Sequence, residues 1–337
     1  MPFTRRRFIA ISAAAAGLPL LPVRTFAGTP QESTPTLRTW NGVALGADAA
    51  LQINHPDAAV ADRLIEQSIA EVHRLERIFS LYREDSAIRQ LNAAGALADP
   101  PEDLSRILAE SDEFSAATGG AFDISVQPLW DLYATHFTRD YHDTKGPAPG
   151  EIAAALARVD HRAIAFDTRR IAFARPGMAI TLNGIGEGYI SDRVAEILLA
   201  NGIEQALVDM GEIRALGGRP QGGPWLVGLE DPRHPGEVLE KLPVRDRAVA
   251  TSGGYGTQFD AKGRFNHLFD PHTGATSSLY LAVTVVAPTT TMADALSTGF
   301  SLMPLEATQR VVERYGIEAH FVLPDGSRVR QGGNARG

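Results

Sequence analysis

The sequence predicts an α+β fold rather than a doubly wound parallel sheet. Residues 58–79 carry apolar side chains every three or four positions, the period of a helix with one buried face. Several shorter runs rich in Val, Leu and Ile are typical of strands. The two kinds of segment do not alternate as they would in a series of βαβ units. No repeat, low-complexity block or clear linker divides the chain, so we expect one intertwined unit.

The first 27 residues indicate an export signal. Three arginines precede Phe8 and Ile9, as in twin-arginine signals; a short apolar run and small residues then lead to a cleavage site after Ala27. The run is too short to remain as a membrane anchor. The alternative is a basic N-terminus followed by an apolar run that arose by chance. We expect a periplasmic protein with no membrane span after cleavage, a disordered leader over 28–37 and one domain over 38–330.

Helices are predicted from the spacing of apolar residues and from residues that commonly end a helix. Besides 58–79, we expect helices over 101–118, ending at a Gly-Gly pair, from near Glu151, and from Gly188 to Leu199. A polar loop over 140–150 precedes the third helix. Strand-like runs occupy 206–210, 224–230, 279–288 and 317–324.

Composition excludes several classes of function. The 337 residues are 44% apolar and 21% charged, which is ample for a core, and the net charge of −8 gives no basic face for nucleic acid. There is no cysteine. The chain therefore has no disulfide, no lipid-modified cysteine and no thiolate metal site.

Two glycine-containing segments interrupt the apolar pattern in the middle of the chain. In 181–198, "TLNGIGEGYISDRVAEIL", glycines lead into a helix whose N-terminal N–H groups could face a phosphate, although many such turns only begin a helix. In 208–218, "VDMGEIRALGG", a strand ends where backbone could approach a ligand, although a β-turn explains it as well.

A third segment, 249–274, combines small, aromatic and titratable residues. Thr251, Ser252 and two glycines precede Tyr255, which could stack on a ring. The stretch "DAKG" at 260–263 also fits a turn between two strands of a hairpin. In "FNHLFDPHTG", 265–274, Asp-Pro and Thr-Gly fit a plain turn, but a turn does not account for His267.

A fourth segment, 289–303, begins with three threonines suited to cap a helix. Asp294 and Thr298 are four residues apart and therefore share one helix face. A carboxylate and a hydroxyl together suit a hard cation such as magnesium. The structural alternative is an acidic residue in a first helical turn, which the helix dipole favours.

In this order, these segments resemble the ApbE family of FAD:protein FMN transferases. The resemblance runs from about Trp40 to Pro324. Its motifs are these: "FSLYREDSAIRQLN" (79–92), "GGAFDISVQPLWDLY" (119–133), the glycine turn 183–192, the strand-Gly segment, Thr-Ser-Gly-x-Tyr, "H-x-x-D-P-x-T-G" and "A-D-A-L-x-T". It implies a T-fold-related architecture of mixed or antiparallel sheets packed with helices.

The resemblance implies transfer of FMN from FAD to a threonine or serine hydroxyl of a partner protein, with release of AMP. It implies a Mg²⁺ site, or a Ca²⁺ site, formed by the Gly186 carbonyl, Asp294 and Thr298. His267 would take the hydroxyl proton or bind phosphate, and Asp294 would act with it. The FAD contacts implied are Tyr82, Asp123, Asn183, Gly184, Glu187, Ser252, Gly253, Tyr255 and His267.

The chain departs from the family pattern at three places. Glu187 stands where lysine is usual, Gly254 where aspartate is frequent, and Thr181–Gly184 replace Asp-Leu-Gly-Gly. These departures resemble the NosX-type periplasmic branch, whose implied partner is a membrane-bound, periplasm-facing acceptor, the flavoprotein NosR. A carboxylate at 187 would repel a pyrophosphate unless it points away or reaches the metal. Two alternatives therefore stay open: an assembly factor that binds FAD, and one that hydrolyses it, for a periplasmic respiratory complex.

Overall fold

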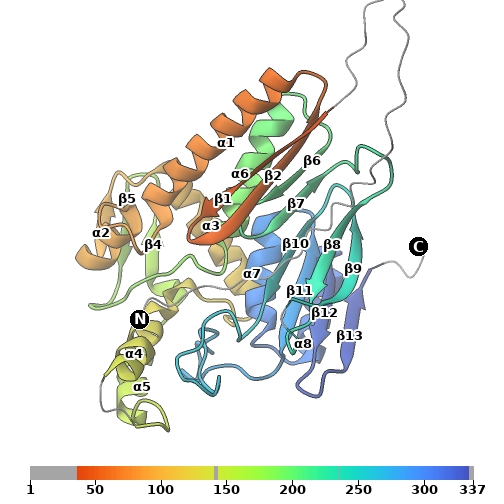
Figure 1. The fold of residues 1–337 in the computed structure, drawn as a ribbon. Helices are drawn as coiled ribbons and strands as arrows, with labels where there is room; N and C mark the ends of the chain where they lie inside the picture. The colour runs from red at the N-terminus through yellow and green to blue at the C-terminus, as the bar shows by residue number, and fades with distance from the viewer. Residues whose placement is uncertain (1–35, 140–142, 235, 334–337) are drawn as a thin grey trace, which may run out of the picture.

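The computed structural model describes residues 36–139, 143–234 and 236–333, and its centre is an eight-stranded antiparallel sheet (Figure 1). The strands, in spatial order, are β1 (Thr36–Ala44), β2 (Ala47–His55), β6 (Ala206–Asp209), β7 (Ile213–Leu216), β10 (Ala248–Ser252), β11 (Ala282–Ala287), β12 (Glu318–Val322) and β13 (Arg328–Gly332). Strand β2 pairs with β6, which follows it by some 150 residues. The two halves of the chain are therefore interleaved in one sheet.

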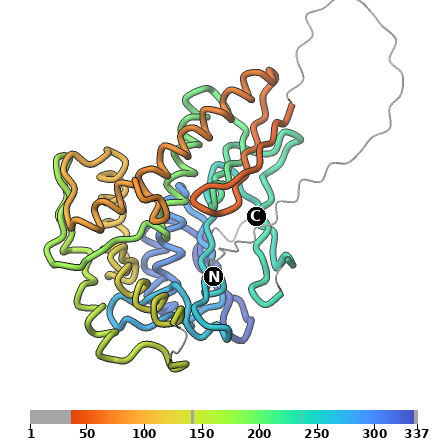
Figure 2. The backbone as a smooth tube through the Cα atoms, turned by 60° about the vertical axis from the view of Figure 1, so that its left-hand side comes forward, coloured from red at the N-terminus to blue at the C-terminus, as the bar shows by residue number. Residues whose placement is uncertain are grey.

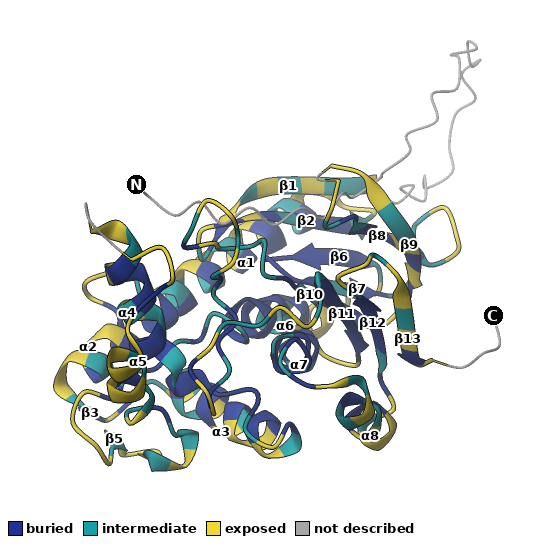
Figure 3. Ribbon diagram, turned by 90° about the horizontal axis from the view of Figure 1, so that it is seen from below, coloured by how far each residue is buried: buried dark blue, intermediate teal, exposed yellow. Residues whose placement is uncertain are grey.

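Helices cover one face of this sheet. They are α1 (Ala58–Phe79), α3 (Glu102–Ala117), α6 (Gly186–Ala200), α7 (Thr290–Phe300) and α8 (Leu305–Tyr315). The Asp57 carboxylate begins α1 by accepting from Ala59 N at 2.8 Å. Figure 3 shows α6 and α7 buried beneath the strands. Together they enclose the main apolar core, which includes Leu51, Ile190 and Phe321.

A two-stranded ribbon covers the opposite face. Strands β8 (Trp225–Glu230) and β9 (Val238–Val244) pack Trp225 and Val227 against Ile213 and Val249 of the large sheet. Trp225 Nε1 also donates to the Leu216 carbonyl at 3.1 Å. A buried indole keeps its polar atom satisfied in this way.

Two smaller bodies flank the sheet. One is α2 (Ala87–Ala94) with the antiparallel strands β3 (Ala96–Ala98), β5 (Arg170–Phe173) and β4 (Ile164–Phe166). The other comprises α4 (Gln127–Thr138), α5 (Pro149–Leu156) and the loop 253–277, which lie side by side (Figure 2). Single 3-10 turns at Ile124–Val126 and His161–Ala163 flank the α4–α5 pair. We call the apolar cluster of this second body the aromatic cluster; it includes Tyr133, Phe259, Phe265 and Phe269.

Most predicted elements are confirmed. Helix α1 has the predicted bounds, and α3, α5 and α6 lie within one or two residues of expectation. The predicted strand 279–288 is shorter, since β11 begins only at Ala282. The predicted leader 28–37 ends too late, because Thr36 and Leu37 already belong to β1; the signal over 1–27 lies outside the described residues. The hairpin expected around 260–263 is a turn closed by a single bridge, Gln258 with Asn266.

Candidate active site

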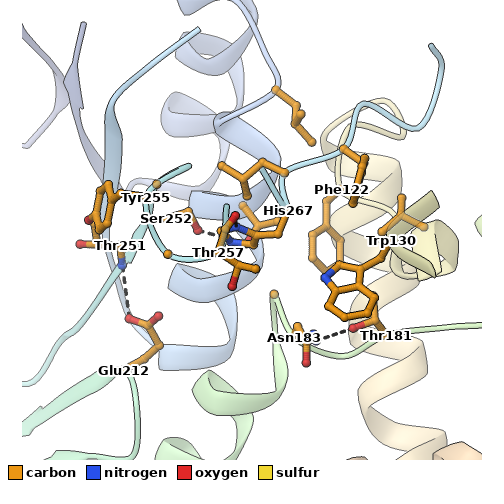
Figure 4. A pocket seen from close by; sticks show the side chains of 18 of the residues that line it. Phe122, Trp130, Thr181, Asn183, Glu212, Thr251, Ser252, Tyr255, Thr257 and His267 are labelled. Carbon is orange, nitrogen blue, oxygen red and sulfur yellow. Dashed lines mark hydrogen bonds between the residues drawn. The ribbon is translucent and has the colours of Figure 1, made fainter. Parts of the chain in front are cut away.

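The predicted segments meet at one cavity between the main core and the aromatic cluster (Figure 4). Of the residues singled out from the sequence, those that line it are Tyr82, Asp123, Thr181, Asn183, Gly184, Thr251, Ser252, Gly253, Tyr255, His267 and Thr298. Figure 4 shows Tyr255 and Ser252 on one side, Asn183 and Trp130 on the other, and His267 between them. An elongated ligand with an aromatic group at each end would fit this arrangement.

Three predicted residues, Gly186, Glu187 and Asp294, are buried and do not line the cavity. Glu187 lies in the first turn of α6 and packs against Gly211, where an added Cβ would come within 2.3 Å of its Oε2. Gly211 has a φ of +102°, a conformation that favours glycine. The Glu187 carboxylate therefore stands behind the cavity wall and not on it.

The glycine turn is in direct contact with α7, from Thr290 in its first turn to Thr298 in its last. Gly188 N donates to Asp294 Oδ2 at 3.0 Å. An added Cβ on Gly184 would lie 2.8 Å from Thr298 Oγ1, and one on Gly188 would lie 2.5 Å from the Thr290 carbonyl. Glycine is therefore required for this approach of the backbone to α7. The predicted meeting of these two segments is confirmed.

The oxygen atoms at this contact suit a hard cation. Asp294 supplies a carboxylate and Thr298 a hydroxyl at this contact, and Gly186 is the first residue of α6. In the described part of the chain, no group of three or more His, Asp or Glu side chains could hold a metal. A cation here would have one protein carboxylate, leaving room for oxygens of a charged ligand, as is usual for Mg²⁺. Asp294 itself is fully buried.

Ser252 connects the end of β10 to α7. Its Oγ lies 2.8 Å from Ser297 Oγ and 3.1 Å from Thr298 Oγ1. The strand ends at Ser252, and the backbone then turns through Gly253, whose Cβ position would be 2.3 Å from the Tyr255 ring. This contact brings the small-residue loop next to the oxygens of α7.

The His267 ring is oriented by backbone. Its Nδ1 lies 3.3 Å from the Thr257 carbonyl, which also accepts from His267 N at 3.2 Å. A carbonyl oxygen can only accept a hydrogen bond, so in the neutral ring Nδ1 carries the proton. Nε2 is then the ring atom that can accept a proton. An added Cβ on Gly256 would lie 3.2 Å from the ring, so glycine leaves it room.

The residues after His267 form the predicted turn. The Asp270 carboxylate accepts from His272 N and Thr273 Oγ1, both at 2.8 Å, and Gly274 has a φ of +72°. Tyr133 of α4 donates to the Gly274 carbonyl at 3.2 Å. The turn therefore anchors the loop to the aromatic cluster and does not itself line the cavity.

Asp123 is both structural and part of the cavity wall. Its carboxylate accepts from Ser125 N at 2.7 Å, Ser125 Oγ at 2.6 Å and His161 N at 3.0 Å. Burial raises the pKa of Asp123 above its ordinary value, although these donors oppose the shift.

Sequence reasoning missed several cavity residues, chiefly Glu212 and Trp130. Glu212 is 1% exposed, and its Oε2 accepts from Thr251 N at 3.2 Å. It follows Gly211 in the strand-Gly segment, whose pattern fitted a β-turn as well as a site. Trp130 stands in the quoted stretch 119–133, but nothing in its spacing indicates which way the ring faces.

No helix within the described residues has the length and apolar character needed to span a bilayer.

Known proteins resemble this chain over most of its length. A model of the ApbE family matches residues 45–321. An FAD:protein FMN transferase of Haemophilus influenzae is 30% identical over 277 residues, covering 79% of this chain and 80% of its own length. One from Treponema pallidum is 30% identical and covers 81% and 80%.

Solved structures show the same fold. The crystal structure of the Pseudomonas stutzeri flavinyl transferase ApbE in its apo form has a TM-score of 0.76 at 26% identity, covering 88% of this chain and 96% of that chain. The ApbE protein of Thermotoga maritima has a TM-score of 0.76 at 29% identity, covering 88% and 97%.

Proposed function

Because the chain belongs to the ApbE family, we propose that it transfers FMN from FAD to a threonine or serine hydroxyl of an acceptor protein and releases AMP. The observation that carries the proposal is the convergence of Ser252, His267 and Thr298 on one cavity with aromatic side chains on either side. FAD is elongated, with a ring system at each end and a diphosphate between. Tyr82 and Trp130 would face one ring system and Tyr255 the other.

In the proposed reaction, the acceptor hydroxyl oxygen attacks the phosphorus of the FMN half. A bond forms from that oxygen to phosphorus, the bridging P–O bond breaks, and AMP leaves with the electron pair. The hydroxyl proton passes to His267 Nε2, since Nδ1 is held by the Thr257 carbonyl. The cavity walls hold the dinucleotide in line with the hydroxyl, which supplies most of what a phosphoryl-type displacement needs.

Asp294, Thr298 and the Gly186 carbonyl would hold a divalent cation, Mg²⁺ or Ca²⁺. When bound, the cation would neutralise charge on the diphosphate oxygens. Asn183 and Gly184, beside Thr298, would contact the same diphosphate. Glu187 is fully buried and packs against Gly211, so its carboxylate is not on the cavity surface.

We further propose a periplasmic location and a membrane-bound, periplasm-facing flavoprotein of the NosR kind as acceptor. The twin-arginine pattern before Ala27 supports the location. The departures at Glu187 and Gly254, which resemble the NosX-type branch, support the acceptor.

The test combines purified protein, FAD, Mg²⁺ and a peptide with one threonine in a Gly-Ala-Thr context. We expect a peptide heavier by one FMN, with AMP in equal amount, and no product after chelation of divalent ions. The isosteric variant Asp294→Asn should lose the cation dependence of FAD binding while staying folded, because an amide still accepts from Gly188 N. AMP without labelled peptide would support FAD hydrolysis instead, and bound FAD with neither product would support a binding protein.

A further inference from the structure

Asp192, on the second turn of α6, caps the N-terminus of the neighbouring helix α7. Its Oδ1 accepts from Thr290 N at 2.9 Å and Thr290 Oγ1 at 3.0 Å. Its Oδ2 accepts from Thr291 N at 2.8 Å and Thr291 Oγ1 at 2.7 Å. Both threonines are buried. One carboxylate thus satisfies four donors at the positive end of a helix, where a negative charge is stabilised.

This cap belongs to a series of contacts between the two segments. Along the α6 segment, positions 184, 188 and 192 recur every four residues, and each touches α7 in turn. Gly184 lies against Thr298, Gly188 N donates to Asp294, and Asp192 binds Thr290 and Thr291. The first two contacts involve Thr298 and Asp294, the side chains assigned to the cation. The third, made by Asp192, lies one turn of α7 before Asp294.

Strand β7 also contacts the start of α7, through Arg214. Arg214 of β7 lies 4.0 Å from Asp192 Oδ1 and donates to the carbonyl of Pro288, just before α7. The start of α7 is therefore held from α6 by a carboxylate and from the sheet by a guanidinium. The side chain of Asp192 is only 15% exposed, so solvent competes weakly for its hydrogen bonds.

From these contacts we propose that Asp192 is a positioning residue that sets α7 in register with the glycine turn, so that Asp294 and Thr298 present their oxygens to a divalent cation together with that turn. Asp192 itself does not line the cavity. The inference rests on the proposed function, because it concerns the cation site assigned there. Removing a group that hydrogen-bonds a metal ligand directly commonly changes metal affinity by about 10–100-fold; Asp192 acts one step further out, through Thr290 and Thr291, so we expect an effect at the lower end.

The test compares four proteins: wild type, Asp192→Asn, Thr291→Val and Glu196→Gln. Asparagine keeps one acceptor oxygen and places an NH₂ group against a backbone N–H and a threonine hydroxyl. The hydroxyl can turn to accept from the NH₂ group, but the backbone N–H loses its acceptor. Valine removes one hydroxyl with little change of shape. Glu196 is a carboxylate on the same helix, 45% exposed and paired with Arg106 and Arg193, and serves as the matched control.

The first readout is Mg²⁺-dependent binding of FAD, followed by calorimetry, and the second is the thermal unfolding midpoint without metal. We expect Asp192→Asn to raise the Mg²⁺ concentration for half-maximal FAD binding about tenfold. Thr291→Val should shift it less and in the same direction, while Glu196→Gln should leave it unchanged.

Two results would overturn the inference. One is an Asp192→Asn variant that melts earlier yet binds Mg²⁺ and FAD like wild type, which would make Asp192 a stabilising residue only. Should that variant not fold, an unchanged Mg²⁺ requirement in folded Thr291→Val would have the same meaning. The wild-type protein tests the proposed function separately: absence of cation-dependent FAD binding there would remove the proposed function, whatever the variants do.

Discussion

Gly188 allows α6 to lie directly on α7. An added Cβ would lie 2.5 Å from the Thr290 carbonyl oxygen and 2.8 Å from Asp294 Cβ, so the helices would have to separate. We expect Gly188→Ala to destabilise the fold by about 3 kcal/mol and to weaken FAD binding. The matched control is Gly150→Ala in α5, where the added methyl meets nothing within 4 Å. Denaturant unfolding measures both; equal stability of the two variants would contradict the close contact.

His267 is the residue whose removal should separate catalysis from binding. We expect His267→Ala to lower kcat by roughly 100-fold or more, while FAD affinity changes little, because the neighbouring wall stays in place. His272 follows in the same loop but is exposed and outside the cavity, so His272→Ala is the control. A loss of FAD affinity with unchanged kcat would mean that His267 only binds the phosphate of FAD.

At the residue scale, the sequence indicated which side chains gather but not which way each faces. Asp294 and Thr298 were placed on one helix face by their spacing alone. Glu187 could not be placed, since a first-turn carboxylate can point to solvent, to a ligand or, as here, to Gly211. The sequence could not predict the cap formed by Asp192 either, because it joins residues about a hundred positions apart.

Strand β12 and its neighbour β13, which forms one edge of the sheet, are joined by a pH-dependent contact. Burial opposes ionisation of Glu318. The hydrogen bond from His320 at 2.5 Å and the salt bridge to Arg330 at 2.9 Å outweigh burial and hold the pKa of Glu318 below its ordinary 4.5. A depressed folded-state pKa adds stability above pH 4.5 that is lost as the pH falls through the folded value.

We therefore expect Glu318→Gln to cost about 1 kcal/mol near pH 6 and progressively less below pH 4.5. Denaturant unfolding at several pH values measures this difference. The control is Glu313→Gln at the end of α8, an exposed residue outside this contact. A Glu318→Gln effect that grew towards acid would contradict the assigned sign.

At the element scale, the long helix α1 was predicted with its bounds, whereas several short elements were not predicted. Helix α1 has 22 residues and a clear apolar stripe, so its bounds could be predicted. Strands β3, β4 and β5 have three or four residues each, too few to show a period of two. The β1–β2 hairpin was missed because its turn, Leu45-Gly46, lacks the usual Asn-Gly or Asp-Gly signal, and both residues have positive φ.

The aromatic cluster links the loop that carries His267 to the rest of the molecule. Tyr133 contacts Phe259, Phe265 and Phe269, with ring centroids 5.0–6.0 Å apart. We expect Tyr133→Ala to cost about 3–5 kcal/mol of local stability and to speed amide hydrogen exchange over α4 and 257–274, while β6 and β10 stay protected. Tyr133→Phe, which loses only the bond to Gly274, is the control. Uniform acceleration throughout the sheet would show instead that the cluster is part of the main core.

At the scale of the whole molecule, the α+β class could be predicted, but the strand order could not. The order of helical and strand-like segments follows from local pattern, and its lack of strict βαβ alternation favoured α+β over a doubly wound sheet. Strand order depends on pairings such as β2 with β6 and β7 with β10, which local pattern does not specify. The meeting of the glycine turn with α7 followed from the family resemblance and not from residue spacing.

The pairing of β2 with β6 also has a consequence for how the protein is made. The first hairpin leaves the ribosome with one edge unsatisfied and must wait for some 150 further residues before its partner strand exists. Closing so long a loop is entropically costly and makes folding slow. A nascent chain halted before residue 206 would expose that edge together with the apolar side of α1, and we expect it to need a chaperone to avoid aggregation.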